Sequence, residues 1–310
     1  MKSKVMSLSD AVATHVQPGT LVALEGFGHL NPVAAAMEIV RQRIPGLTIA
    51  KLTCDFIVDQ LIAAECLDVL ITSFAGNSSG GSLPELRRSA EGCGRSIELS
   101  EFSHGGMVGR YVAGAWNMPF FPLRSYNGSD IPKVNPQIRV TTDPYSGDDF
   151  YCVPPLQPDV TIIHAQRADE AGNVQAWGIL GIQAEAAFAA REVIVTVEEI
   201  VDADVIRSDP NRTIIPSHVV TAVVPAPLGA YPASCQGYYD RDDREYRAWS
   251  ELARDAEAVQ RWIRENVDAY ASHDAYLADH RDAIMSRIGL ENWMSQPVDY
   301  GRRLLEGVRS

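Results

Sequence analysis

The sequence predicts an α/β protein with an open, mainly parallel sheet flanked by helices. Short apolar runs alternate with amphipathic helical stretches over about the first 240 residues, which is typical of consecutive βαβ units. The clearest unit has two β-branched runs, Val160–Ala165 and Val193–Ile200, on either side of the helical stretch Leu180–Arg191. A strand, a helix and a strand within this distance require a parallel pair. Ligands of such sheets bind at the carboxyl ends of the strands.

The N-terminal part begins with the same alternation. Capping residues precede the amphipathic stretch Ala11–Val16, so we expect a helix there. Leu21–Leu24 is expected to be a short strand that runs into the glycine-containing segment Gly26–His29. Asn31-Pro32 can then cap and open a helix that continues through Ile44. A strand, a glycine loop and a helix in this order can bind an anion.

The alternation continues through the next eighty residues. Strands are expected at Leu47–Leu52, Val69–Phe74, Ser96–Phe102 and Met118–Leu123. Helices are expected at Val58–Glu65, Leu83–Ala90 and Gly106–Trp116. The segment Ala75–Ser82 consists of small, flexible residues, so we expect a loop at the end of a buried strand.

The later part of the chain divides by composition. Residues 124–151 are rich in Pro, Gly, Ser, Asn and Asp and are expected to form a structureless lid or subunit-contact loop. Val219–Val224 is expected to be a further strand. We expect an α/β domain over residues 1–240 and a charged, helical extension over residues 241–310. This extension includes the amphipathic stretch Tyr246–Tyr270 and would pack on the domain or on a partner.

Composition and charge exclude several classes of protein. The chain has 310 residues, 46% of them apolar, which suffices for a buried core. Its five cysteines include no C-x-x-C pair, which favours a reduced cytoplasmic protein with buried thiols. A formal net charge of −13 disfavours nucleic-acid binding. We expect neither a membrane helix nor a signal peptide, because the necessary apolar runs are absent from the sequence.

Several motifs follow one another in an order that resembles a known enzyme family. They are VMSLSDAVATHVQPGTLVALEGFGHLNPVAAAMEIV, AGNSSGG, ELSEFSHGG, MPFFPLRS, DVTIIHAQRADEAGNVQAWG, IVTVEEIV followed by DPNRTIIP, and LGAYPASCQGYY. In this order the chain is similar to the α subunit of the family I CoA-transferases, and most of all to the glutaconate CoA-transferase branch. The resemblance extends from near the N-terminus to about Tyr239.

The resemblance implies a reaction and a partner. These enzymes move CoA between small carboxylic or dicarboxylic acids through a glutamyl thioester, with the CoA thioester as a substrate and no permanently bound cofactor. The nucleophilic glutamate lies in the β half, within a Glu-Asn-Gly sequence. This chain has no such sequence, and Glu291-Asn292, a Glu-Asn pair in the helical tail, precedes Trp293 rather than a glycine. We therefore expect the glutamate on a separate β subunit, in an α2β2 hetero-oligomer.

Two loops are candidates for substrate or CoA binding. Gly26, Phe27, Gly28 and His29 match the family's first glycine loop, in which residues without a side chain let the backbone approach a thioester closely. The alternative is a tight turn with an exposed histidine. Asn77 and Ser78 offer amide and hydroxyl donors at a strand end, and the alternative there is a solvated loop.

Glu101 is the candidate catalytic carboxylate of this chain, and Ser103 beside it is a candidate binding residue. Glu101 ends an expected strand, and a carboxylate that enters a dry interface can act as an acid or a base. The chain also resembles the steroid ring-opening hydrolase of cholesterol catabolism, which has an α-chain glutamate at about this position. The alternative is that Glu101 caps the next helix or pairs with Arg110.

The remaining titratable residues favour structural roles. His164 follows a buried strand and is expected to be a hydrogen-bonded core histidine, and Glu198-Glu199 are expected to form a structural pairing with one side chain facing outward. The histidines and cysteines lack metal-ligand spacing, so no metal is predicted. Three functions remain open: a transferase subunit, a component of an acyl-CoA ring-opening hydrolase that uses Glu101, and a non-catalytic acyl-CoA-binding subunit.

Overall fold

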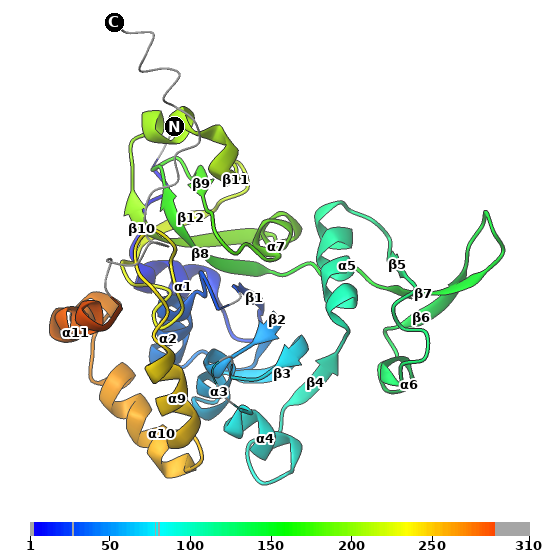
Figure 1. The fold of residues 1–310 in the computed structure, drawn as a ribbon, viewed down its shortest axis with the longest axis horizontal. Helices are drawn as coiled ribbons and strands as arrows, with labels where there is room; N and C mark the ends of the chain where they lie inside the picture. The colour runs from blue at the N-terminus through cyan, green and yellow to red at the C-terminus, as the bar shows by residue number, and fades with distance from the viewer. Residues whose placement is uncertain (1–2, 27, 78, 80, 289–310) are drawn as a thin grey trace, which may run out of the picture.

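The computed structural model describes residues 3–288 except 27, 78 and 80. One mainly parallel sheet forms the body of the molecule, and a narrow arm extends from it (Figure 1). The strands of the main sheet are β1 (Leu21–Glu25), β2 (Leu47–Cys54), β3 (Leu67–Ala75), β4 (Glu98–Glu101), β8 (Val160–Ala168), β9 (Val174–Gln175), β10 (Glu192–Ile200), β11 (Thr213–Ile215) and β12 (Ala222–Pro225).

Parallel pairing in the described residues follows the order β12-β10-β8-β1-β2-β3-β4. The short strand β9 pairs antiparallel with the last two residues of β8, and β11 pairs antiparallel with β9. The predicted βαβ unit is confirmed, because β8 and β10 pair in parallel over their length and α7 (Gln183–Ala189) lies between them in the chain. The carboxyl ends of β1 to β4 therefore lie along one edge of the sheet.

Helices cover both faces of the sheet. The helices before the arm are α1 (Leu8–His15), α2 (Val33–Arg41), α3 (Phe56–Ala63), α4 (Pro84–Ala90) and α5 (His104–Ala115). Alternation along β1 sends Val22 and Leu24 into the cluster that holds α1, α2 and α3, and it sends Ala23 into the cluster that holds α5 and α7. The sheet is thus the middle of three layers, as its near-continuous apolar strands predict.

The tail is helical and packs on the body of the chain. After α8 (Ala203–Ser208) and the 3₁₀ turn Pro210–Arg212 follow α9 (Asp243–Leu252), α10 (Ala256–Ile263) with a π-helical turn (Arg264–Asp268), and α11 (His273–Ile288). Tyr246 and Trp249 of α9 are buried against α3, and the Tyr246 ring meets Phe56 edge-on at 5.2 Å. The boundary at residue 240 stays a prediction, because α9 and α10 share the cluster that holds α2 and α3.

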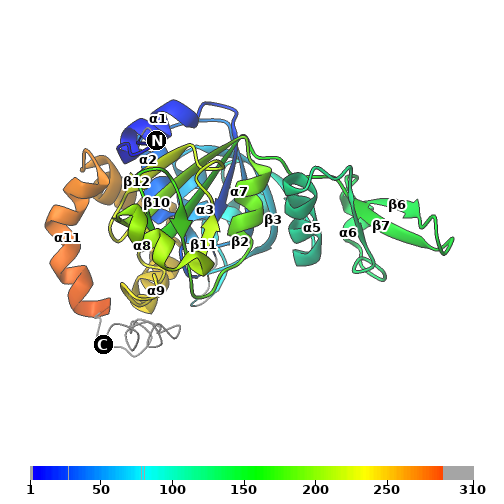
Figure 2. The ribbon, with the colours of Figure 1, turned by 90° about the horizontal axis from the view of Figure 1, so that it is seen from above.

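The arm differs from the expectation of a structureless loop. It contains β5 (Phe121–Leu123), α6 (Ile131–Val134), β6 (Arg139–Thr142) and β7 (Asp149–Val153), and the strands form a sheet in the order β5-β7-β6. Arm and α11 lie at opposite ends of the molecule in both views (Figure 2). β5 lies within the strand expected at Met118–Leu123, whereas β6 and β7 were missed because each has only four or five residues and β6 is polar and largely exposed.

Two smaller predictions also need correction. Asn31 does not cap α2: the N-cap position is Pro32, without a side-chain hydrogen bond, and the Asn31 amide donates to Asp55 instead. The cysteines are not all buried, since Cys93 is exposed and Cys152 is partly exposed. All five are free thiols.

Candidate active site

The predicted site residues lie on loops at the carboxyl ends of β1, β3 and β4. The glycine loop, residues 26–31, follows β1, a second loop of residues 76–82 follows β3, and Glu101 ends β4. Since β1, β2, β3 and β4 are neighbours in this order, the topology brings these loops to one edge of the sheet, where ligands of parallel sheets usually bind.

The glycine loop is tightly packed against itself. A side chain on Gly26 would place its Cβ 2.5 Å from the Leu30 carbonyl oxygen, and Gly28 has a φ of +60°. Both glycines are therefore required by the turn. His29 is buried rather than exposed, and its Nε2 accepts a hydrogen bond of 3.0 Å from the Gln236 N–H. Burial lowers the pKa of His29 to about 4. Phe27 lies outside the described residues.

A buried lysine on the neighbouring strand β2 forms hydrogen bonds with this loop. Lys51 of β2 is fully buried, and its Nζ donates to the Leu24 and Gly26 carbonyl oxygens at 3.0 and 3.1 Å and to Asn31 Oδ1 at 3.2 Å. One ammonium group thus uses its three donors on acceptors at both ends of the loop. The sequence prediction of the site did not include Lys51. A lone lysine inside the apolar run LTIAKLTC is the signal that could have found it.

Two buried carboxyl groups accompany the ammonium group. Glu25 Oε1 accepts hydrogen bonds from the Tyr111 hydroxyl at 2.7 Å and the Leu52 N–H at 2.9 Å. Burial raises the pKa of Glu25 to about 7, although Lys51 opposes the shift. Burial also raises the pKa of Asp55, which caps α3. We call the group made up of Glu25, Asn31, Lys51, Asp55 and Tyr111 the lysine cluster.

The loop after β3 is tied to the helical tail. Asn77 is buried, and its Nδ2 donates to the Tyr246 carbonyl oxygen at 2.6 Å and to Ser250 Oγ at 2.7 Å. Both donors of the amide are therefore used by α9 within this chain. Ser78 lies outside the described residues. The Ser79 hydroxyl donates to Asp243 Oδ1 at 2.5 Å, which adds a second link to α9.

Glu101 is exposed at the end of edge strand β4. It does not cap α5, because Ser103 is the N-cap and its Oγ accepts from the Gly106 N–H at 3.0 Å. Arg110 is buried, lies 4.3 Å over the Phe102 ring and donates to the Pro154 carbonyl oxygen. The Glu101 side chain therefore remains on an open face.

His104 joins this exposed face. The Ser73 hydroxyl donates to the Leu52 carbonyl oxygen at 2.6 Å, so the His104 Nδ1–H must donate to Ser73 Oγ, at 2.9 Å. His104 Nε2 lies 3.4 Å from Thr53 Oγ1, a second hydrogen-bond contact. The ends of β2, β3 and β4 and the start of α5 thus present hydroxyl groups, an imidazole and a carboxyl group. The sequence offered only the adjacency of His104 to Ser103 as a signal.

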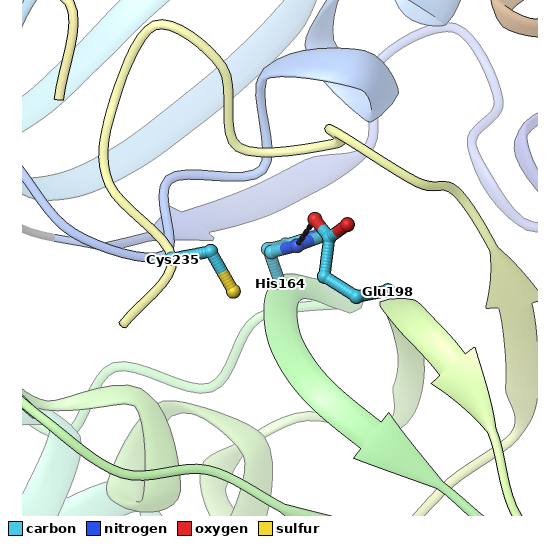
Figure 3. A group of neighbouring side chains, drawn as sticks. All are labelled: His164, Glu198 and Cys235. Carbon is cyan, nitrogen blue, oxygen red and sulfur yellow. Dashed lines mark hydrogen bonds and ion pairs between the residues drawn. The ribbon is translucent and has the colours of Figure 1, made fainter. Parts of the chain in front are cut away.

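A second buried polar group lies under the ends of β8 and β10 (Figure 3). His164 is fully buried and its Nε2 lies 2.8 Å from Glu198 Oε1. Glu198 Oε1 also accepts from the Tyr239 hydroxyl at 2.7 Å, and its Oε2 accepts from the Leu228 N–H at 2.8 Å. The predictions of a core histidine and of a structural pairing by Glu198 are confirmed. We call His164, Glu198 and Tyr239 the histidine–glutamate cluster.

Cys235 lies beside this cluster, and its Sγ is within 4.8 Å of ligand atoms of His164 and Glu198. Figure 3 shows the sulfur near the imidazole, while a hydrogen bond joins the imidazole to the carboxylate. Because a carboxylate only accepts, the proton of that bond is on Nε2, and both oxygens of Glu198 already accept from donors. The arrangement therefore fits a satisfied hydrogen-bond network better than a metal site.

One cavity lies away from these residues, between α2, α3 and the tail helices. Its volume is about 120 Å³, and aromatic and aliphatic side chains such as Phe56, Trp249, Trp262 and Tyr276 line much of it. None of the predicted site residues lines it. The chemistry of the strand ends and this apolar cavity are thus separate features.

Comparison with known proteins decides the family. The family model of the coenzyme A transferases matches residues 5–226. The chain therefore belongs to the coenzyme A transferase family. It is 46% identical over 266 residues to the α subunit of the 3-oxoadipate CoA-transferase of Pseudomonas knackmussii, an alignment that covers 86% of this chain and 94% of the relative.

Glutaconate CoA-transferase of Acidaminococcus fermentans is similar in sequence and structure. Its α subunit is 33% identical over 292 residues, which covers 89% of this chain and 91% of the relative. The crystal structure of that enzyme superposes with a TM-score of 0.87 at 31% identity, over 96% of this chain and 99% of the solved one. The expected fold is thereby confirmed. The cholesterol ring-cleaving hydrolase IpdA subunit of Rhodococcus jostii is 25% identical over 287 residues, 89% of this chain and 95% of the relative.

Within residues 3–288, apart from the three undescribed positions, no helix has the length and apolarity needed to cross a bilayer.

Proposed function

We propose that this chain is the α subunit of a heteromeric CoA-transferase that moves CoA between small dicarboxylic acids. The observation that carries the proposal is the 46% identity over 94% of a relative named as the corresponding subunit of a 3-oxoadipate CoA-transferase. A β subunit would supply the nucleophilic glutamate, since no Glu-Asn-Gly sequence occurs in this chain. A CoA thioester is then a substrate, and an α2β2 assembly is the expected form.

The reaction needs a carboxylate nucleophile and donors for the developing oxyanion. The partner's glutamate would attack the thioester carbonyl and expel CoA as a thiolate, which leaves an acyl-glutamyl anhydride. The thiolate would then attack the glutamyl carbonyl, release the first acid and form the glutamyl thioester. The second acid would reverse both steps. This chain would form the facing wall with the glycine loop, Ser103 and the exposed groups around Glu101.

The arm and the edge of the sheet offer a surface for the β subunit. Strand β4 is an unpaired edge within the described residues, and Leu99 on it is 49% exposed. Trp116 after α5, Val134 of α6 and Tyr145 of the arm are 74%, 77% and 97% exposed. Large exposed apolar side chains beside an open sheet edge are typical of a protein interface. Glu101 ends the same edge strand, so this contact would enclose it.

The test is an exchange assay on the purified complex. The chain is produced alone and together with its partner, and each sample receives succinyl-CoA with 3-oxoadipate or with glutaconate as acceptor. We expect new acyl-CoA only from the complex, and a covalent glutamyl thioester on the β subunit that mass spectrometry detects after incubation with acyl-CoA. A complex that binds acyl-CoA without exchange would instead support a non-catalytic binding subunit and would contradict the proposal.

A ring-opening hydrolase is the second candidate, favoured by the exposed Glu101 three residues before the exposed His104, whose Nδ1 is hydrogen-bonded to Ser73. Glu101 would then activate water or deprotonate a cyclic acyl-CoA. A Glu101→Gln complex separates the two functions. Under the transferase proposal, exchange falls by no more than about tenfold, because the nucleophile lies on the partner. An opened ring as the product of the wild-type complex, without exchange between two acids, would favour the hydrolase, and Glu101→Gln should then abolish ring opening.

A further inference from the structure

Arg241 lies between the glycine loop and the loop after β3. Its Nη2 donates to Ser79 Oγ in the loop after β3, and its Nε pairs with Asp243 Oδ1 at 2.9 Å. The guanidinium group stacks over the Tyr246 ring, 4.5 Å from the ring centroid. Three contacts therefore fix the plane of the guanidinium group, so its remaining edge has a defined direction.

That remaining edge faces the glycine loop. A Cβ built on Gly28 would lie 3.4 Å from Arg241 Nη1, so the absent side chain leaves room directly beside this nitrogen. Within the described part of the chain, Nη1 has neither a hydrogen bond nor an ion pair. The side chain is 28% exposed, so solvent or a ligand can reach it. An anchored arginine with one open edge is suited to binding a carboxylate.

We propose that Arg241 is a specificity-determining residue that binds the distal carboxylate of the dicarboxylic acid substrate, the one that does not react. This inference rests on the proposed transferase function. Gly28 follows β1, and Ser79 follows β3, two strands away. The Arg241 side chain spans from one loop to the other, and Glu101 on β4 lies one strand beyond β3 along the same edge of the sheet.

The local charges allow such an anion. The nearest acidic partner, Asp243, is half-exposed and already shared between Arg241 and Ser79. Asp55 is buried and also interacts electrostatically with Arg241, and Lys51 offsets part of its charge. A monocarboxylic acid with a methyl group in place of the distal carboxylate would leave Nη1 without its partner. The complex should therefore discriminate between the two acids.

The experiment compares two acceptors that differ only at the distal group, 3-oxoadipate and 3-oxohexanoate, with the purified complex. For Arg241→Met we expect the KM for 3-oxoadipate to rise about 10- to 100-fold, because a charge-assisted hydrogen bond is lost. The KM for 3-oxohexanoate should stay within about twofold. Arg241→Lys should fall between wild type and Arg241→Met. Arg254→Met is the matched control, since that exposed arginine pairs with Glu251 at 3.0 Å, and both KM values should stay unchanged.

Equal increases of both KM values in Arg241→Met would show a merely structural role and overturn the proposal. An increase only in the KM for the CoA thioester would place a phosphate of CoA at Arg241 instead, which would also overturn it. If Arg241→Met does not assemble with its partner, Arg241→Lys decides, because it keeps the charge but loses the planar edge. In that case a selective increase of the KM for 3-oxoadipate supports the proposal, and equal increases contradict it.

Calorimetric titration of the complex with each free acid separates this inference from the proposed function. If the wild-type complex shows no exchange but binds 3-oxoadipate at least tenfold more tightly than 3-oxohexanoate, and Arg241→Met removes that difference, the Arg241 site is correct and the transferase proposal is wrong. If exchange occurs but wild-type binding does not discriminate between the two acids, the transferase proposal survives and the Arg241 site does not.

Discussion

The lysine cluster supplies hydrogen-bond donors to a loop that follows a strand, whereas the histidine–glutamate cluster supplies acceptors. In the lysine cluster a donor, the Lys51 ammonium group, satisfies the carbonyl oxygens of Leu24 and Gly26. In the other cluster an acceptor, the Glu198 carboxylate, satisfies the Leu228 N–H and the Tyr239 hydroxyl. Loops that leave a parallel sheet carry unpaired backbone donors and acceptors, and buried groups must be paired. Each cluster thus anchors one loop.

The two anchored loops meet each other. The Leu30 N–H donates to the Ser234 carbonyl oxygen at 2.9 Å, and the Gln236 N–H donates to His29 at 3.0 Å. The clusters differ in their titratable groups, because the lysine cluster also contains two buried carboxyl groups with raised pKa values, Glu25 and Asp55. We therefore expect loss of Lys51 to be costlier than loss of Glu198, and we expect pH to affect mainly the lysine cluster.

The largest effect should come from Lys51→Met. It leaves three buried acceptors without a donor and two buried carboxyl groups without a cation, so the free energy of unfolding should fall by about 3–5 kcal/mol. Urea titration at pH 7 measures it. Lys133→Met, at an exposed lysine paired with Asp130, is the control and should have no measurable effect. A loss in Lys51→Met below about 1 kcal/mol would contradict the anchoring role.

The next effect concerns pH and Glu25. Its pKa rises from 4.5 in the unfolded chain to about 7 in the folded protein, so the folded state binds the proton more tightly. The contribution to stability is complete below pH 4.5 and is lost as the pH rises from 4.5 to 7. It is on the order of 3 kcal/mol.

Urea titrations at several pH values compare wild type with Glu25→Gln. The wild-type advantage should shrink as the pH rises through this window, while Asp59, whose pKa is also raised to about 7, contributes equally to both proteins. Parallel curves for the two proteins would show that Glu25 does not titrate as described.

Glu198→Gln should have a smaller effect, about 2 kcal/mol, because one amide group replaces an acceptor that serves three donors. The adjacent Glu199 provides the matched control. Its exposed side chain accepts from the Tyr238 hydroxyl at 2.7 Å, so Glu199→Gln should leave the thermal midpoint almost unchanged. If both variants unfold at the same temperature, the cluster does not anchor the loop.

The smallest effect on stability should come from substitutions of the exposed residues Glu101 and His104. Glu101→Gln and His104→Gln should leave thermal unfolding unchanged, because neither side chain fills the core. Their effects should appear only in turnover of the complex. A marked destabilisation of the isolated chain by either substitution would show that these residues support the fold rather than the chemistry.

The fold was predictable because core strands such as β8 and β10 carry continuous apolar runs, and α7 between them dictates parallel pairing. The arm between residues 124 and 151 was not, since its short strands pair in a small sheet of their own, outside the main sheet. The sequence located the glycine loop and the Asn77 loop, but it could not show that Asn77 binds α9, a contact across 169 residues. Nor could it show that His29 is buried, because the covering Gln236 lies 207 residues away.

The segment that covers the glycine loop belongs to residues 226–239, which follow the last strand of the sheet. The ribosome therefore synthesises this covering segment after all the strands of the main sheet. A chain truncated after residue 226, where the family match ends, would retain the residues of its parallel strands and Lys51. It would lack the segment with Gln236, whose N–H donates to His29. Truncation at the family boundary also removes α9, α10 and α11 with the buried Tyr246 and Trp249, so it should weaken the helical signal in circular dichroism and lower stability as well as uncover His29.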